Sequence, residues 1–322
     1  LRTAEVAYFS ARGQLIWSEP RGERAGYAWP QFSIHRGRLQ MLLYAAVRER
    51  LGDAAVRLGA AVQTWRAAAD GVEVDLVERA TGRALGAAHG AVLIAADGIH
   101  SSVRAALYPG EGAPAWGGTV MWRGVTSGPR FLTGRTMAMA GYKQRKFVCY
   151  PIADRAADGA SDGGSVINWI ADLAFPPDYL WNREDWNRPG RLEDFLPKFD
   201  HWQFDWLDVP AVIRAAERVL EYPMVDRDPV PRWTHGPATL LGDAAHAMYP
   251  IGSNGASQAI LDARVLAREI RAHGATGAAL LAYEAERRPA TAKIVLANRG
   301  DGPDRILDLV QERAPGGFAR IG

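Results

Sequence analysis

Cysteine is nearly absent from this chain, since Cys149 is the only one among 322 residues. A single cysteine excludes an internal disulfide framework and any multi-cysteine metal site. It also favours a reducing, cytoplasmic compartment. The seven histidines show no metal-ligand spacing, so we expect no metal site. Cys149 stands in an apolar FVCY stretch and is interpreted as a core residue rather than a nucleophile.

An excess of charge of one sign is also missing. Lys and Arg number 38 and Asp and Glu 36, which gives a formal net charge of +2. A nucleic-acid binder needs a concentrated basic face, so we expect no nucleic-acid partner. No run of about 18 apolar residues occurs, and we expect no membrane partner. What is present is an ordinary globular composition, 48% hydrophobic and 23% charged.

Two short apolar runs mark the most buried strands. Residues 91–96 are continuously apolar, which is typical of a strand covered on both faces, and 238–241 are interpreted as another buried strand. Apolar residues at helical spacing predict helices over 35–51 and 255–273. Between the two runs, residues 111–221 hold most of the eleven tryptophans and several strand-like stretches. The sequence therefore predicts an α/β fold with an inserted, sheet-bearing second domain.

Each predicted helix has a predicted apolar face. On the first helix the face consists of Leu39, Leu42, Leu43, Ala46, Val47 and Leu51. On the second it consists of Ala256, Ala259, Ile260, Ala263, Ala267 and Ile270. Further helical sequence is expected from about 178 to 218 and over 277–299, where Pro289 predicts a kink or break. The basic run at 143–146 is interpreted as a solvated loop, and 301–322 as a loosely ordered tail.

The most informative segment is 240–263, LLGDAAHAMYPIGSNGASQAILDA. It combines a buried strand, an acidic residue at the carboxyl end of that strand, a Gly-rich loop and the start of a helix. Open α/β sheets bind ligands at the carboxyl ends of their strands, and a helix N-terminus offers unpaired N–H groups. Gly252 and Gly255 permit close approach of the backbone to a flat ligand, and Asp243 can accept hydrogen bonds from sugar-like hydroxyls.

This segment resembles the second flavin-binding motif of the class A FAD-dependent aromatic hydroxylases. The family pattern is GDAAH, then Pro-x-Gly, then Gly-x-Asn and an Asp-Ala pair. The chain departs from it once, because Ser257 stands where Asn is usual. The resemblance implies that Asp243 holds the ribityl chain of FAD, and that the backbone of Gly255, Ala256 and Ser257 faces the N1/O2 edge of the isoalloxazine. Gly252 matches the glycine of Pro-x-Gly.

Two further stretches resemble the same family. AVLIAADGIHSSVR, at 91–104, is similar to its DG motif, which implies that Asp97 and Gly98 lie near the FAD. For Arg104, at the end of that motif, two interpretations stay open: a group that carries phosphate charge, and a solvated helix arginine. The family commonly has Arg-x-x-Leu at the head of its first helix, which implies a contact of Arg36 with FAD. Val62 matches a backbone contact to the adenine.

The resemblance implies a fold, an activity and cofactors. The expected fold is a flavin-type (Rossmann-like) FAD-binding domain over 1–110 and 222–300, with a substrate domain over 111–221. The implied activity is FAD-dependent hydroxylation of a small aromatic substrate with NADH or NADPH and O2, through a flavin C4a-hydroperoxide. Stretches such as MWRGV and EYPMVDRDP look most like members that act on phenazine carboxylates. No catalytic residue is assigned.

One family motif is missing from the chain. The family opens with a βαβ unit whose GxGxxG loop cradles the FAD pyrophosphate, and no GxGxxG occurs here. We therefore expect a fragment of a longer chain, and as an alternative an incomplete or non-catalytic flavin-fold scaffold. Several residues are candidates to line an aromatic pocket, although each alone is as well interpreted as core. These are Trp122, Tyr142, Tyr150, Asn168, Tyr222, Met224 and Tyr249.

Overall fold

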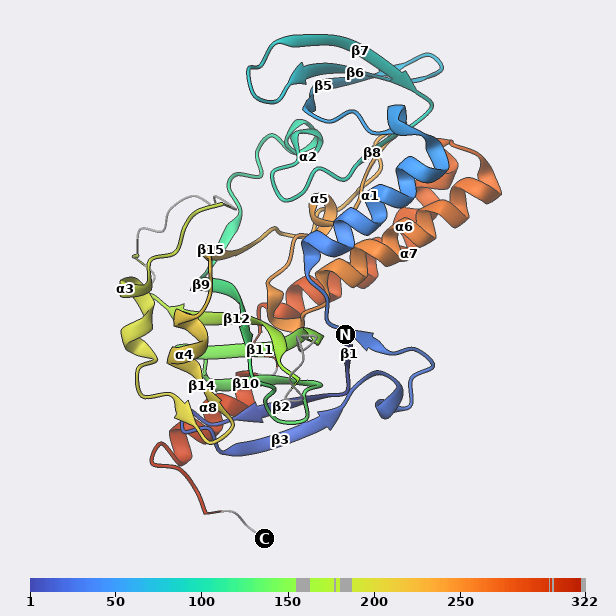
Figure 1. Cartoon of the computed structure of the whole chain (residues 1–322). Helices are drawn as coiled ribbons and strands as arrows, with labels where there is room; N and C mark the ends of the chain where they lie inside the picture. The colour runs from blue at the N-terminus through green and yellow to red at the C-terminus, as the bar shows by residue number, and fades with distance from the viewer. Residues whose placement is uncertain (155–162, 177, 180–186, 301, 303, 320–322) are drawn as a thin grey trace. The chain divides into compact units, whose positions relative to one another are not determined.

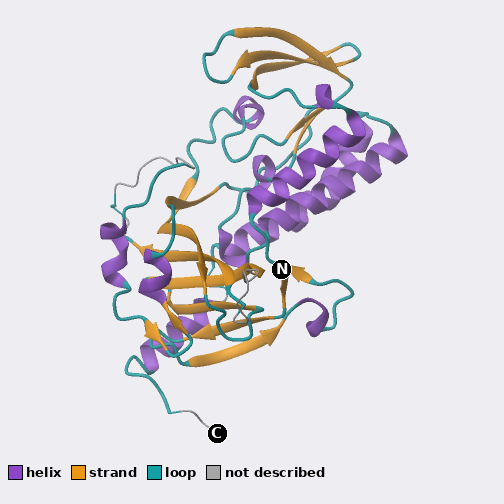
Figure 2. Ribbon diagram, in the orientation of Figure 1, coloured by secondary structure: helices purple, strands orange, loops and turns teal. Residues whose placement is uncertain are grey.

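A computed structural model describes residues 1–154, 163–176, 178–179, 187–300, 302 and 304–319 (Figures 1 and 2). It confirms the mixed α/β fold predicted from the sequence. The chain divides into two compact units, each assembled from separate stretches. We call Leu1–Arg50, Gly118–Met224 and Pro303–Gly322 the sheet unit. We call Leu51–Gly117 and Val225–Gly302 the helix unit.

The sheet unit is built on a seven-stranded sheet in the order β15-β9-β12-β11-β10-β2-β3. Strands β9 to β12 are antiparallel neighbours, whereas β2 pairs in parallel with β10. The strands are β2 (Glu5–Phe9), β3 (Leu15–Pro20), β9 (Ala115–Gly128), β10 (Thr136–Tyr142), β11 (Arg145–Asp154), β12 (Ser165–Ala174) and β15 (Val219–Asp226). The antiparallel sheet predicted for 111–221 is thus present, and β2 and β3 extend it.

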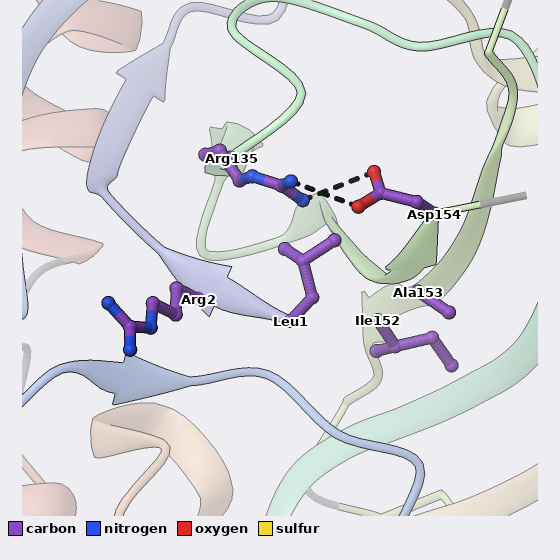
Figure 3. Close-up of a pocket in the computed structure, with 6 residues that line it drawn as sticks. All are labelled: Leu1, Arg2, Arg135, Ile152, Ala153 and Asp154. Atoms are coloured by element: carbon purple, nitrogen blue, oxygen red, sulfur yellow. Dashed lines mark hydrogen bonds and ion pairs between the residues drawn. The ribbon is translucent and has the colours of Figure 1, made fainter.

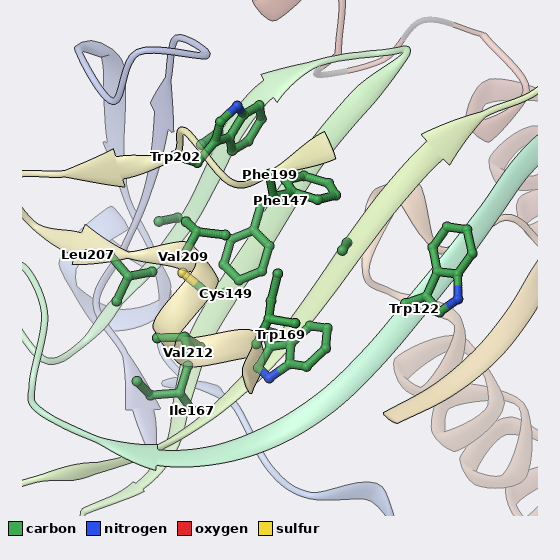
Figure 4. Close-up of a cluster of buried hydrophobic side chains, with 14 of the residues drawn as sticks. Trp122, Phe147, Cys149, Ile167, Trp169, Phe199, Trp202, Leu207, Val209 and Val212 are labelled. Atoms are coloured by element: carbon green, nitrogen blue, oxygen red, sulfur yellow. The ribbon is translucent and has the colours of Figure 1, made fainter. Parts of the chain in front are cut away.

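One face of this sheet carries the main core (Figure 4). Strand residues alternate between the faces, and every second residue of β12 from Ser165 to Ala171 is fully buried. Trp169 fills the centre of the core, and a Cβ at Gly124 would lie 2.3 Å from its ring. Glycine is therefore required at that position for β9 to approach the indole. Cys149 is buried here as a core residue, as expected.

Several short elements and the longer helix α1 complete the sheet unit. They are β1 (Arg2–Thr3), η1 (Gly22–Ala25), β4 (Gln31–Phe32), α1 (Arg36–Leu51), α3 (Leu192–Phe195), η3 (Leu196–Lys198), β13 (Gln203–Phe204), β14 (Leu207–Asp208), α4 (Val209–Arg214) and α8 (Asp304–Arg313). The prediction of a long helical patch over 178–218 is wrong apart from its short α3, η3 and α4, and 180–186 lie outside the described residues. The loosely ordered tail is also wrong, because α8 packs Leu307 into the second core of the sheet.

The helix unit pairs two parallel strands with two long helices. Its elements are η2 (Asp53–Ala55), β5 (Ala60–Ala68), β6 (Gly71–Glu78), β7 (Ala84–Gly90), β8 (Leu93–Ala95), α2 (Ser102–Leu107), β16 (Ala238–Leu240), α5 (Asp243–His246), η4 (Pro250–Gly252), α6 (Gly255–His273) and α7 (Gly277–Asn298). Strands β5, β6 and β7 form a separate antiparallel sheet. Helix α7 runs unbroken through Pro289, so the predicted break there is wrong.

The two long helices predicted from periodicity are present, but their buried faces differ from those predicted. On α6 the buried residues are Asp262, Val265 and Leu266, while Ile260 is 53% exposed. The reason is that the buried stripe of α6 contains the charged residue Asp262, and a prediction from apolar positions alone does not include it. Helix α1 buries none of its residues.

The compact units group the chain differently from the predicted domains. The prediction joined 1–110, whereas residues 1–50 cluster with the large sheet and 51–117 with α6 and α7. Hydrogen bonding explains the grouping, since β2 and β3 are strands of the seven-stranded sheet. Which unit binds which ligand stays a prediction.

Candidate functional site

The two predicted motifs of the helix unit meet at the ends of two adjacent parallel strands. Strand β8 pairs with β16 in parallel register, with Ala95 opposite Leu240. The DG motif follows β8 and the GDAAH motif follows β16, so Asp97 and Asp243 leave the same edge of the pair. This edge is where open α/β sheets place their ligands.

Asp243 is available to a ligand. Its side chain is exposed, and no hydrogen bond or ion pair ties it to another described residue. Gly242 precedes it with φ +61°, a conformation that favours glycine. The glycine therefore permits the sharp turn that ends the strand and presents Asp243 at the start of α5.

The start of α6 is also open. Its N-cap residue Asn254 makes no side-chain capping hydrogen bond, so the first N–H groups of this 19-residue helix lack partners. Gly255, Ala256 and Ser257 form this first turn and are half-buried or exposed. The amide oxygen Oδ1 of Asn254 is buried without a partner. Both features fit a flavin. The exposed carboxylate can accept hydrogen bonds from the flavin's hydroxyls, and the uncapped helix start can bind the partly negative edge of its ring.

Asp97 and Val62 are brought together through one serine. The Asp97 carboxylate accepts hydrogen bonds from Ser102 N at 2.8 Å and Ser102 Oγ at 3.3 Å. Ser102 Oγ also lies 3.2 Å from the carbonyl oxygen of Val62, to which it can donate. Asp97 thus holds the start of α2, and Gly98, with φ +81°, turns the chain between them. The contacts of these residues with a cofactor stay predictions.

Arg104 is neither a phosphate ligand nor a solvated arginine, so both interpretations from the sequence are wrong. Its side chain is buried, and its guanidinium forms an ion pair with Glu111. It also donates to the carbonyl oxygens of Ala244 and Ala245 at 3.0 and 2.9 Å. Arg104 therefore ties the DG motif to the GDAAH motif, and all its donors are used inside the protein.

A buried charge network lies beneath the GDAAH turn, and the sequence analysis assigned it no role. The Asp262 carboxylate of α6 accepts from Gly242 N at 3.1 Å and from Arg287 Nε of α7 at 2.7 Å. His246 Nε2 lies 2.5 Å from the same carboxylate. Asp262 is fully buried and His246 nearly so. The signal available in the sequence was an acidic residue at helical spacing from Val265 and Leu266.

The network keeps Asp262 ionised. Burial by itself raises the pKa of this carboxyl group, but the hydrogen bond and charge of His246 lower it, as do Arg287 and Gly242 N–H. The net pKa is below its ordinary value. A charged Asp262 thus fixes the strand end, α6 and α7 to one another, and with them the residues that flank the proposed flavin site.

The remaining predicted residues lie as follows. Gly252 ends η4, where an added Cβ would lie 3.0 Å from Asn298 Oδ1. Arg36 is exposed and is the first residue of α1, in the sheet unit. Its contact with the flavin stays a prediction.

Comparison with known proteins identifies the family to which the chain belongs. Residues 220–298 match the model of an FAD-binding domain family. Over 300 residues the chain is 47% identical to the phenazine 1,6-dicarboxylic acid hydroxylase PhzS of Lysobacter antibioticus, covering 93% of this chain and 73% of that protein. Over 298 residues it is 31% identical to the 3-amino-4-hydroxybenzoate 2-monooxygenase PtnB3 of Streptomyces platensis, covering 89% and 68%. The chain belongs to the class A flavoprotein monooxygenases.

Solved structures of similar fold agree with this assignment. Klebsiella pneumoniae HpxO complexed with FAD and uric acid superposes with a TM-score of 0.73 at 23% identity, covering 97% of this chain and 76% of that one. A salicylate hydroxylase substrate complex gives 0.70 at 22% identity, covering 97% and 78%. The predicted family, its flavin-type fold and FAD as its cofactor are thus confirmed.

This class A flavoprotein monooxygenase is an FAD-dependent aromatic hydroxylase. In the described part of the chain, no helix combines the length and apolar character needed to cross a bilayer.

Proposed function

We propose that the enzyme uses NADH or NADPH and O2 to hydroxylate a phenazine-type aromatic acid. When bound, FAD would supply the redox chemistry: it would take two electrons from the nicotinamide and activate O2, so that one oxygen atom enters the ring and the other leaves as water. The protein contributes binding, orientation and exclusion of water. The substrate class is supported by the identity of 47% to a relative named as a phenazine 1,6-dicarboxylic acid hydroxylase.

The observation that carries the flavin part of the proposal is the free carboxylate of Asp243 beside an uncapped α6. We assign Asp243 to the ribityl hydroxyls, and the first turn of α6 to the N1/O2 edge of the ring. Reduced flavin carries negative charge near N1, which a helix N-terminus stabilises. Gly252, Asp97, Gly98, Val62 and Arg36 complete the proposed cofactor contacts.

The variant Asp243→Ala tests this assignment. Loss of charge-assisted hydrogen bonds weakens FAD binding by at least about tenfold, measured as Kd by flavin fluorescence. Activity per bound flavin changes much less, because Asp243 is proposed to hold the cofactor and not the reacting atoms. Asp70→Ala removes an exposed carboxylate of the same unit and serves as the matched control. Unchanged FAD affinity in Asp243→Ala would show that the motif is wrongly assigned.

Oxygen uptake and product mass test the reaction. NAD(P)H oxidation is measured with phenazine-1-carboxylate, salicylate and nicotinate, and the products are analysed after reaction under labelled O2. We expect one labelled oxygen atom in the phenazine product. Product from the single-ring acids alone would keep the hydroxylase activity and reject the phenazine assignment. If no compound stimulates NAD(P)H oxidation or gains oxygen, the proposed reaction fails.

A further inference from the structure

The second face of the seven-stranded sheet differs from the core face. It is half-open, because Val166, Asn168 and Ile170 of β12 are only partly buried. Cross-strand register places its residues in rows that run across β11, β12 and β9. Three successive rows are Lys146, Asp172 and Met121; Val148, Ile170 and Arg123; and Tyr150, Asn168 and Val125.

The charged side chains of the first row are buried and face one another. Lys146 Nζ lies 2.7 Å from Asp304 of α8 and 3.6 Å from Asp172, and all three side chains are buried. The interpretation of residue 146 as part of a solvated loop is therefore wrong. Asp172, in this first row, is an acidic neighbour of Arg123 in the second row, and it already faces Lys146.

Arg123, in the second row, is a cation without an anionic partner among the described residues. Its Nε is buried and makes no hydrogen bond. Its guanidinium carbon lies 5.5 Å from the ring centre of Tyr222, and one terminal nitrogen lies 3.4 Å from the sulfur of Met121. Burial, and then the like charge of Arg36, lower the pKa of this guanidinium. A half-buried cation whose Nε is buried without a hydrogen bond, next to a second cation, is costly unless an anion completes the site.

A cavity lies along the same face, at the third row and beyond. Its volume is about 650 Å³, which suits a fused aromatic ligand. The sheet contributes Val125, Val166 and Ile152. Ile34, just before α1, and Met41 and Leu42, in the first half of α1, line the other side. Val125 is two residues from Arg123 on β9, so both lie on this face. Most of the lining is apolar, but His35 and the positively charged Arg38 also line the cavity. Arg36 adds a second positive charge near Arg123.

A second, smaller cavity of the sheet unit provides the contrast (Figure 3). It measures about 350 Å³ and is lined by Arg135 and Asp154, whose charged groups lie 2.9 Å apart. Arg2 also lines it and pairs with Glu23, so both arginines of this cavity are paired within the protein. Arg123 has no such pair, so the cavity along its face is the better site for an anionic ligand.

We propose that Arg123 anchors the carboxylate of the aromatic substrate, with the ring in the adjoining cavity. This inference rests on the proposed function and names its substrate class, a flat aromatic acid. Guanidinium binds carboxylate through paired hydrogen bonds, and the free Nε and a terminal N–H are suited to such a pair. Tyr222 would lie against the guanidinium, and Tyr150 and Asn168 would supply polar contacts in the next row.

The test compares two ligands of the same shape and different charge. Equilibrium dialysis measures Kd for phenazine-1-carboxylate and phenazine-1-carboxamide on the chain and its variants. The wild type is expected to prefer the carboxylate by roughly 10- to 150-fold, the range for one charged hydrogen-bonded pair. Arg123→Gln should abolish this preference, and Arg123→Lys should restore part of it.

Three controls separate the possible causes. Arg214→Gln removes an arginine that is 56% exposed in the same unit, and should keep the preference. Thermal unfolding and FAD affinity show whether Arg123→Gln is folded, since a purely structural role would weaken both ligands equally. Retained carboxylate preference in Arg123→Gln overturns the inference, as does a wild type that binds both ligands equally or neither. A wild type that binds no FAD or inserts no oxygen would instead contradict the proposed function.

Discussion

At the scale of single residues, the burial of charged side chains was the hardest property to predict from the sequence. Arg104 and Lys146 carry the same charges as surface residues, yet both are buried. Besides Glu111, which is near it in the chain, Arg104 binds the carbonyls of Ala244 and Ala245, and Lys146 binds Asp304. The last three partners lie more than a hundred residues away along the chain, so no local pattern predicts them. The position of Asp243 was easier to predict. An acidic residue directly after a buried strand lies at the ligand-binding edge of the sheet, and this does not depend on residues far away in the sequence.

The buried Asp262 predicts a defined dependence of stability on pH. Asp262→Asn removes the charge that Arg287 and His246 face, which costs about 3–5 kcal/mol of unfolding free energy near neutral pH. The pKa of Asp262 is lowered in the folded state. Its contribution is therefore complete above the unfolded carboxyl pKa of about 3.9 and is lost as pH falls through the folded-state pKa.

Urea unfolding of the wild type and of Asp262→Asn over a pH series measures this difference. The gap in unfolding free energy should stay constant from neutral pH to about pH 5 and shrink only in more acidic solution. Asp70→Asn, which changes an exposed carboxyl group, should show no such gap. A gap that closes already between pH 7 and 5 would mean that the charge of Asp262 does not control the stability of the network.

At the scale of elements, periodicity predicted the position of helices better than their environment. The helix at 255–273 has the predicted bounds, but its buried face does not, because Asp262 belongs to it. Helix α8 was missed because its ten residues are rich in charge. What holds α8 is the contact of Leu307 with the sheet and of Asp304 with Lys146, and neither can be inferred from helix propensity.

Lys146→Met tests how far one buried cation fixes α8. Without Lys146, the carboxylates of Asp172 and Asp304 face each other in a buried site, and their repulsion should loosen the helix. Hydrogen–deuterium exchange of residues 304–313 should then become at least tenfold faster, while the strands β11 and β12 keep their protection. Lys198→Met, at an exposed position, is the control. Unchanged exchange would show that Leu307 and the hydrogen bond from Lys143 N to Asp308 hold the helix without Lys146 Nζ.

At the scale of the molecule, the sequence predicted two kinds of unit but not which stretches belong to each. Apolar runs and the tryptophan-rich stretch separate a strand–helix part from a sheet. These patterns do not predict to which part β2 belongs, because a short strand is suited to either. In the structure β2 pairs with β10 of the large sheet. The two proposals of ligand binding can nevertheless be assigned to units, because their residues are distinct. Most of the proposed flavin contacts lie in the helix unit, and the proposed carboxylate anchor lies in the sheet unit.

Exchange protection by each ligand alone tests this assignment. FAD should slow amide exchange at 93–102 and 242–258, where the two motifs follow β8 and β16. Phenazine-1-carboxylate should slow it at 121–125, 148–152 and 166–170, the strands that carry Arg123 and line its cavity. Asp243→Ala should lose the first effect and keep the second, and Arg123→Gln should do the reverse. If FAD left 242–258 unprotected, the proposed flavin contacts would be wrong. A helix start that binds an anion donates its free N–H groups to that anion, and those amides must then exchange more slowly.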